Sequence, residues 1–199
     1  MKTLLAFCMI IQALYVSGQE EISSKKGCKI GLKVSYYPTA GSRRFLRGSE
    51  DVPMINGKEF YSAEIVCLNR VSKKLDLESG LGYANHSVEV DPWGINNEYK
   101  EVLPVLYIPV ALRYNFHKYA FVSSGIFFGF DFSEPGEFSN QTGIGLSLSG
   151  GFNYEFRNKT GVSVSPYINL HSWLCYDYGP FNNDKLVEIS IKLGLYYRL

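Results

Sequence analysis

The sequence predicts an all-β protein, an eight-stranded antiparallel up-and-down transmembrane β-barrel. Three observations predict it: alternating segments, a regular rhythm of connections, and aromatic residues near strand ends. The clearest segment is 143–157, where even positions such as Ile144 and Phe152 are apolar and odd positions such as Ser147 are Gly, Ser or polar. Because side chains alternate across a strand, this segment has one apolar and one small polar face. An apolar outside with a crowded polar inside is typical of barrels in lipid.

Seven further segments alternate in the same way. The eight predicted strands cover residues 29–37, 59–69, 74–86, 103–116, 119–132, 143–157, 160–173 and 185–199. Each can cross a bilayer at a tilt, which takes about 9–11 residues. Pro109 and Pro166 fall inside predicted strands, where each removes a ladder hydrogen bond, so we expect bulges there.

The connections alternate strictly between long and short. Those at 70–73, 117–118 and 157–160 are short, whereas those at 38–58, 87–102, 133–141 and 174–184 are longer. Outer-membrane barrels have short periplasmic turns and longer extracellular loops, which places both termini in the periplasm.

Aromatic residues are predicted to gather at both membrane interfaces. With the orientation above, one group falls at the outer rim: Tyr36, Tyr83, Phe128, Phe130 and Trp173. A second group falls at the periplasmic rim: Tyr114, Tyr154, Phe156 and Tyr197.

Composition and the first residues narrow the class of protein. The chain has 199 residues and a net charge of +1, which gives no electrostatic case for binding nucleic acid. Residues 1–18 resemble a secretory signal peptide, with Lys2, an apolar run and a small-residue end, so residues 19–199 would form the barrel domain. The remaining cysteines, Cys28, Cys67 and Cys175, form no metal motif, although Cys28 and Cys67 could be neighbours on adjacent strands.

Two stretches resemble a known family. They are Leu103-Pro-Val-Leu-Tyr-Ile-Pro-Val-Ala-Leu-Arg-Tyr-Asn-Phe116, with the aromatic–glycine strand that follows to Asp131, and the terminal Leu193-Gly-Leu-Tyr-Tyr-Arg-Leu199. They resemble the PorT-like outer-membrane β-barrel family, which is similar in shape to small OmpX and OmpA-type barrels. The resemblance implies a location in the outer membrane, insertion by the barrel-assembly machinery, and a role in a protein-secretion apparatus. It implies no catalytic residues.

Charged residues are predicted on the inner face of the barrel. They are Lys29, Lys33, Glu64, Asp76, Glu78, Arg113, Asp131, Glu155, Arg157, Glu188, Lys192 and Arg198. In so narrow a barrel side chains fill the interior, so these charges must be paired. A structural plug of salt bridges is favoured over an ion path, and we expect Arg113 to pair with Asp76, Glu78 or Glu155.

An enzyme is the less favoured alternative. Lipid-modifying barrels need a His, a Ser and an acid converging near the outer rim. His86 with Ser87 and His171 with Ser172 lie there, but neighbours in a strand point to opposite faces. We therefore predict no enzyme, and no catalytic, cofactor-binding or metal-binding residues. The triplets at Asn85, Asn140 and Asn158 match a glycosylation pattern that we attribute to chance.

Binding through the extracellular loops is the favoured function, with outer-membrane lipid and an extracellular or secretion-machinery protein as partners. The loop residues that could contact a partner are Arg43, Arg44, Arg47, Glu50, Asp51, Trp93, Tyr176, Tyr178 and Phe181. The alternatives are a secretion component and passage of a small hydrophobic molecule. A soluble lipocalin-like barrel is the alternative architecture.

Overall fold

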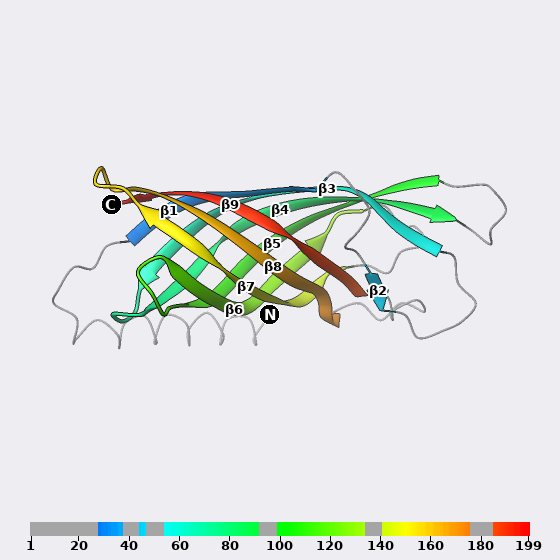
Figure 1. Cartoon of the computed structure of the whole chain (residues 1–199). Helices are drawn as coiled ribbons and strands as arrows, with labels where there is room; N and C mark the ends of the chain where they lie inside the picture. Colours follow the sequence, from blue (N-terminus) through cyan, green and yellow to red (C-terminus); the bar gives the residue numbers. More distant parts are fainter. Residues whose placement is uncertain (1–27, 38–43, 47–53, 92–98, 134–140, 176–184) are drawn as a thin grey trace.

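The structure is a computed structural model that describes residues 28–37, 44–46, 54–91, 99–133, 141–175 and 185–199. These residues form strands and their connections, without a helix (Figure 1). The strands are β1 Cys28–Tyr37, β2 Arg44–Leu46, β3 Met54–Arg70, β4 Leu75–Asp91, β5 Tyr99–Asn115, β6 Ala120–Asp131, β7 Gly143–Glu155, β8 Thr160–Cys175 and β9 Lys185–Arg198. No helix in this part of the chain could cross a bilayer.

Eight of the strands close into a barrel. β1 and β3 to β9 pair with their neighbours in chain order, every pairing is antiparallel, and β1 also pairs with β9. The closing pairs run from Lys29–Arg198 to Val34–Leu193, and pairing of the two outermost strands is what a β-structure needs inside lipid. The predicted eight-stranded barrel is confirmed. The short β2 was not predicted. It pairs with residues 185–187 of β9, on the same side of β9 as β1, which pairs with residues 193–198.

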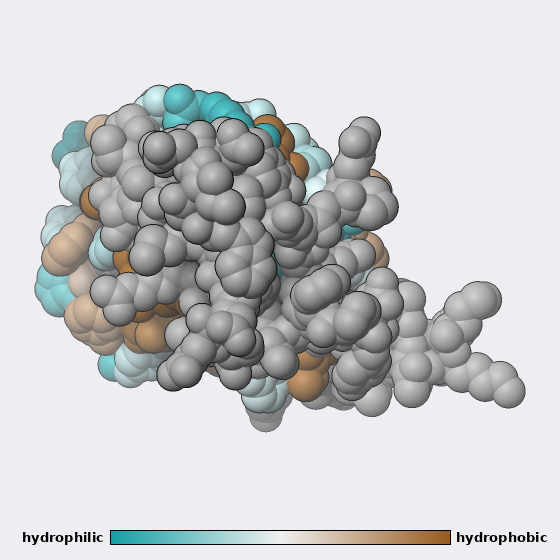
Figure 2. Space-filling model, turned by 90° about the vertical axis from the view of Figure 1, so that its right-hand side faces the viewer, coloured by the Kyte–Doolittle hydropathy of each residue, from teal (hydrophilic) through white to brown (hydrophobic). Residues whose placement is uncertain are grey.

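The barrel is apolar outside and polar inside. Along β9, for example, Ile189, Ile191 and Leu193 are exposed, whereas Ser190 and Lys192 between them are buried. Brown apolar side chains are visible on the flanks of the barrel when it is viewed from the end opposite the short turns (Figure 2). A soluble lipocalin-like barrel would bury its apolar face and expose its polar face. That alternative is therefore wrong, and the outer face is suited to lipid.

Three short turns lie at one end of the barrel, with the C-terminus beside them (Figure 1). They occupy residues 71–74, 116–119 and 156–159, close to the predicted positions. The backbone N–H of Val71 donates to Leu75 O at 2.9 Å, and that of Phe156 donates to Thr160 O at 2.8 Å. At the same end, Leu199 N donates to Cys28 O at 3.1 Å, which places the start of β1 next to the end of β9.

The two in-strand prolines do not create bulges. The register on either side of Pro109 and of Pro166 is unchanged, and the ladder lacks only the pairs of each proline and of one adjacent residue, Ile108 with β4 and Ser165 with β7. Register shifts occur elsewhere, between Gly57 and Phe60 and between Ile144 and Leu146. The prediction of bulges at the prolines was wrong because a barrel strand can lose the bond on one side and keep the register with both neighbours.

Exposed aromatic side chains are found near both ends of the outer face. Near the short turns, the rings of Tyr119 and Tyr154 stack at 5.9 Å, and Tyr154 meets Phe156 edge-on at 5.0 Å. Toward the other end, Tyr61 and Tyr83 lie 6.4 Å apart, and Tyr61 accepts a hydrogen bond from Asn85 at 3.0 Å. This arrangement is the one that membrane interfaces favour.

Cys28 and Cys67 are neighbours across β1 and β3, as the sequence allowed. Both are thiols, and their sulfur atoms lie 2.7 Å apart. The two cysteines lie at the short-turn end of the barrel, where β1 begins.

Candidate functional site: the polar interior of the barrel

Strand alternation brings most of the predicted charged set to the interior. Its fully buried members are Lys33, Glu64, Asp76, Glu78, Arg113, Glu188 and Lys192. Lys29, Asp131 and Glu155 are half-buried, and Arg157 and Arg198 are exposed at the short-turn end. The prediction that these charges face inward is confirmed for the buried and half-buried members, and Arg157 and Arg198 line the opening of the interior at the short-turn end.

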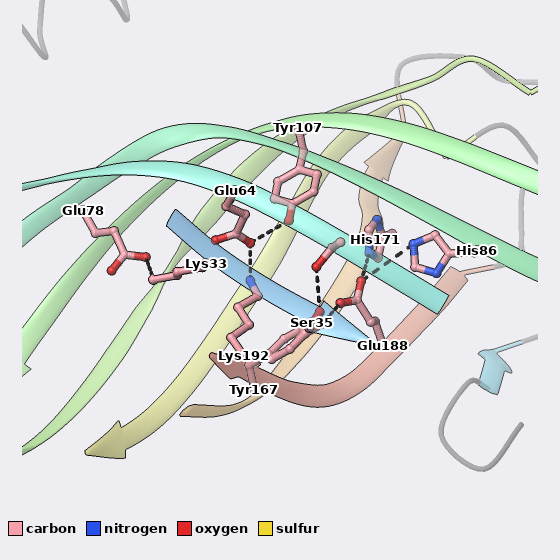
Figure 3. A network of polar contacts seen from close by, with 11 residues as sticks. Lys33, Ser35, Glu64, Glu78, His86, Tyr107, Tyr167, His171, Glu188 and Lys192 are labelled. Atoms are coloured by element: carbon pink, nitrogen blue, oxygen red, sulfur yellow. Dashed lines mark hydrogen bonds and ion pairs between the residues drawn. The ribbon is translucent and has the colours of Figure 1, made fainter. Parts of the chain in front are cut away.

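Two groups of ion pairs cross the middle of the barrel (Figure 3). Lys33 on β1 donates to Glu78 on β4. Lys192 on β9 donates to Oε1 of Glu64 on β3, and the hydroxyl of Tyr107 on β5 donates to the same oxygen at 2.6 Å. Each of these contacts joins two strands that have one other strand between them, and together they form a plug in the interior. The predicted plug of salt bridges is confirmed at these two places.

Inward aromatic rings complete the plug, and two of them lie over glycines. Tyr107 is opposite Gly82 in the β4–β5 ladder, and Phe127 is opposite Gly145 in the β6–β7 ladder. A Cβ atom at either glycine would overlap the facing ring. The small polar face noted in the sequence therefore makes room for large side chains from the neighbouring strand.

A second polar cluster lies nearer the end opposite the short turns. It consists of His86 on β4, His171 on β8 and Glu188 on β9, all of them buried. Nε2 of His171 lies 3.0 Å from Oε2 of Glu188, and Nε2 of His86 lies 3.8 Å from the same oxygen. The hydroxyl of Tyr167 donates to the other carboxylate oxygen, Oε1, and also contacts the hydroxyl of Ser35 at 3.0 Å.

Aromatic packing orients the two imidazole rings. Phe60 packs against His86 with ring centroids 4.7 Å apart, and Phe127 meets His171 edge-on at 4.9 Å. The two imidazoles are 5.4 Å apart in an edge-on arrangement. Figure 3 shows both rings turned toward Glu188.

This cluster is not predicted from the sequence, where each histidine stands beside a serine and no ligand set is apparent. His86 on β4 lies far in the chain from His171 and Glu188 on the consecutive strands β8 and β9, so no local motif marks the three residues. The available signal was the inward parity of all three positions, combined with their similar distance from the long connections.

Arg113 does not form the predicted ion pair. It points inward and is buried, but no acid pairs with it among the described residues. Instead its guanidinium lies over the ring of Phe121, 3.5 Å from the centroid. Each of the three expected acids is bound by another side chain.

Asp76 faces Arg113 in the ladder but accepts from Arg70 Nε at 3.2 Å and from Asn115 Nδ2 at 2.8 Å. Glu78 is held by Lys33. Glu155 binds Lys29 at 2.6 Å and Arg198 at 2.9 Å. The prediction was wrong because other side chains lie close to all three carboxylates and bind them.

The short-turn end of the interior opens into a basin of about 770 Å³. Two acids line it, Asp76 and Glu155. The basic side chains that line it are Lys29, Arg70, Lys73, Lys74, Arg113, Lys118, Arg157, Lys159 and Arg198. With this excess of positive charge, the basin attracts anions.

Most loop residues expected to contact a partner lie outside the described residues. These are Arg43, Arg47, Glu50, Asp51, Trp93, Tyr176, Tyr178 and Phe181, and the predicted signal peptide at 1–18 and Asn140 also lie outside them. Arg44 is the first residue of β2. Asn85 is half-buried within β4, and Asn158 bonds to Thr160 in the turn between β7 and β8.

Comparisons with known proteins support the fold. The structure is similar to the outer membrane protein OprG from Pseudomonas aeruginosa, with a TM-score of 0.57 and 15% sequence identity over 88% of this chain and 97% of that chain. This chain has the fold of an outer-membrane β-barrel. No protein-family model matches the sequence, and the search of curated proteins found no match.

Two weaker similarities involve other barrels. The designed barrel TMB2.3 has a TM-score of 0.41 and 10% identity over 89% of this chain and 98% of that chain. The COG4313 outer membrane channel from Pseudomonas putida F1 has a TM-score of 0.39 and 8% identity over 91% of this chain and 98% of that chain. At TM-scores this low, they add nothing to the assignment of the fold.

Proposed function

We propose that this protein is an integral outer-membrane barrel that is closed to solutes and acts as a membrane-embedded binding scaffold. One observation carries the proposal: every long strand turns apolar residues outward, while ion pairs and aromatic rings fill the interior. An eight-stranded barrel has room for side chains but not for an aqueous channel as well. Its activity would then lie at its ends, through groups that the barrel holds in place.

The proposed orientation puts the short turns and both the N- and C-termini of the barrel domain in the periplasm. The short turns at 71–74, 116–119 and 156–159 support it, as does the contact between Leu199 and Cys28 at that end. The basic basin would then face the periplasm. The proposed partners are membrane lipid around the barrel, the barrel-assembly machinery during insertion, and a protein at one end.

Membership of the PorT-like family and a role in protein secretion stay predictions that rest on the resemblance of 103–116 and 193–199. Passage of a small hydrophobic molecule also stays a prediction. That the chain is not an enzyme stays a prediction too.

Fractionation and conductance test the proposal together. We expect the protein to remain in the outer-membrane fraction after an alkaline carbonate wash and to need detergent for extraction. In planar bilayers the purified protein should give no stable conductance steps. A protein found in the soluble fraction would contradict the membrane assignment, and wild-type steps resembling those of a porin would contradict a closed interior.

A cleared-lumen variant serves as the matched control for the conductance experiment. Replacing Lys33, Glu64, Glu78 and Lys192 together by alanine removes both groups of ion pairs from the plug. We expect this variant, if it shows the heat-dependent gel mobility of a folded barrel, to conduct more than the wild type. Equal conductance in the two proteins would show that the ion pairs are not what closes the barrel.

A further inference from the structure

The cluster of His86, His171 and Glu188 has the composition of a metal site. Two imidazoles and one carboxylate are ligands that zinc and neighbouring divalent transition metals prefer. The three ligand atoms all lie within 4.8 Å of one another. They come from β4, β8 and β9, which are rigid strands and not loops.

The distances suit a bound ion. For metal–ligand bonds of about 2.1 Å in a tetrahedron, neighbouring ligand atoms are about 3.4 Å apart. The distances from Glu188 Oε2 to the two Nε2 atoms, 3.0 Å for His171 and 3.8 Å for His86, lie on either side of that value. Small side-chain movements would bring all three atoms into coordination range.

The surrounding residues leave the right oxygen of Glu188 available. Tyr167 occupies Oε1, so Oε2 is the atom that faces both imidazoles. Groups around a metal site commonly orient its ligands in this way. Phe60 and Phe127 play the corresponding part for the imidazoles by packing against their rings.

The backbone is irregular at both histidines. The register between β3 and β4 shifts between Gly57 and Phe60, and Phe60 pairs with His86. The register between β7 and β8 shifts opposite the segment that contains His171, and Ser172 has a positive φ of 48°. Bulges next to functional sites redirect side chains, and both histidines are buried in the interior here.

We propose that His86, His171 and Glu188 bind a divalent transition-metal ion of the zinc class inside the barrel, near the end opposite the short turns. Three protein ligands leave at least one coordination position for water or for a small ligand. The proposal concerns binding and not catalysis. It does not depend on the barrel being closed to solutes, so each idea can fail alone.

Metal titration of the untagged protein in detergent tests the proposal. The chain has three histidines, and His117 lies exposed in the turn at 116–119, so His117→Gln is the matched control. We expect the wild type and His117→Gln to bind one equivalent of Zn²⁺ after removal of bound metal. Co²⁺ should give the visible absorption of a low-coordinate site in both proteins.

His171→Gln and Glu188→Gln should each weaken Zn²⁺ binding by about 100-fold or more, because even residues behind the ligands typically contribute 10–100-fold. Heat-dependent gel mobility checks that each variant is folded. If a variant does not fold, X-ray absorption of the zinc-loaded wild type decides, and it should show two imidazoles and one carboxylate oxygen. Absence of stoichiometric binding by the folded wild type, or equal loss in His117→Gln, would overturn the proposal.

Discussion

The two ends of the barrel interior differ in how their polar side chains are compensated. Toward the end opposite the short turns, the acid Glu188 is enclosed by Tyr167 and two imidazoles, and every member of the group is buried. At the short-turn end, Lys29, Glu155 and Arg198 form an ion-paired group that stays partly exposed to a basin of about 770 Å³.

The difference indicates which part of the interior contributes most to the free energy of unfolding. Removing one partner of a fully buried ion pair leaves a charge without compensation, which costs about 3–5 kcal/mol. A partly exposed pair is screened by solvent and contributes about 0–1 kcal/mol. The middle and the far end of the interior should therefore determine stability, whereas the basin is free to vary.

The largest expected effect comes from Glu64, and Glu155 is its matched comparison because each of these acids binds a lysine. Glu64→Gln leaves Lys192 buried without a counter-charge and weakens the bond from Tyr107, so the free energy of unfolding should fall by about 3–5 kcal/mol. Glu155→Gln acts on the basin, where Lys29 and Arg198 are partly exposed, and should cost less than about 1 kcal/mol.

Urea unfolding in detergent, followed by tryptophan fluorescence, measures both changes under identical conditions. Equal losses in the two variants would show that the basin is as dry as the plug, and the comparison between the two ends would fail.

A medium effect is expected for the glycines beneath the aromatic rings. Gly145→Val pushes against the ring of Phe127, which also packs on His171, so it should cost about 1–3 kcal/mol through overpacking. Gly150→Val lies on the same strand, where the nearest atom to a new Cβ is Phe121 O at 3.6 Å. This matched control should change stability by less than about 0.5 kcal/mol.

The same unfolding measurement distinguishes these two variants. If Gly150→Val proved as damaging as Gly145→Val, the loss would come from the strand backbone, and the ring–glycine packing would not be its cause.

Much of the fold could be predicted because the alternation of apolar and polar residues along each strand shows which side faces lipid and which faces the interior. Ile191, Lys192 and Leu193 already indicate which face meets lipid. The short turns follow from the breaks between alternating segments. What alternation cannot show is a strand of three residues such as Arg44–Leu46, whose pairing with β9 depends on tertiary contact alone. The alternation also cannot show on which of its two neighbouring strands a proline loses its ladder pair.

The interior was harder to predict than the wall, because parity gives the face of a side chain but not its depth or its partner. All of the acids proposed for Arg113 do face inward, yet Arg70, Asn115, Lys33 and Lys29 bind them instead. The cluster at Glu188 needs the relative stagger of β4, β8 and β9, which depends on bulges that the sequence does not mark.

A small effect is expected for Arg113, whose ion pair was predicted incorrectly. Arg113→Met removes a charge without an acid partner, and a Met side chain can still pack over the ring of Phe121, a contact worth about 0.3–1.5 kcal/mol. The free energy of unfolding should therefore change by no more than about 1 kcal/mol. Lys192→Met is the matched comparison, since it leaves Glu64 buried without its cation and should cost about 3–5 kcal/mol. Equal losses would mean that an anion neutralises Arg113 in the folded protein, and the basin would then be an occupied site at the short-turn end.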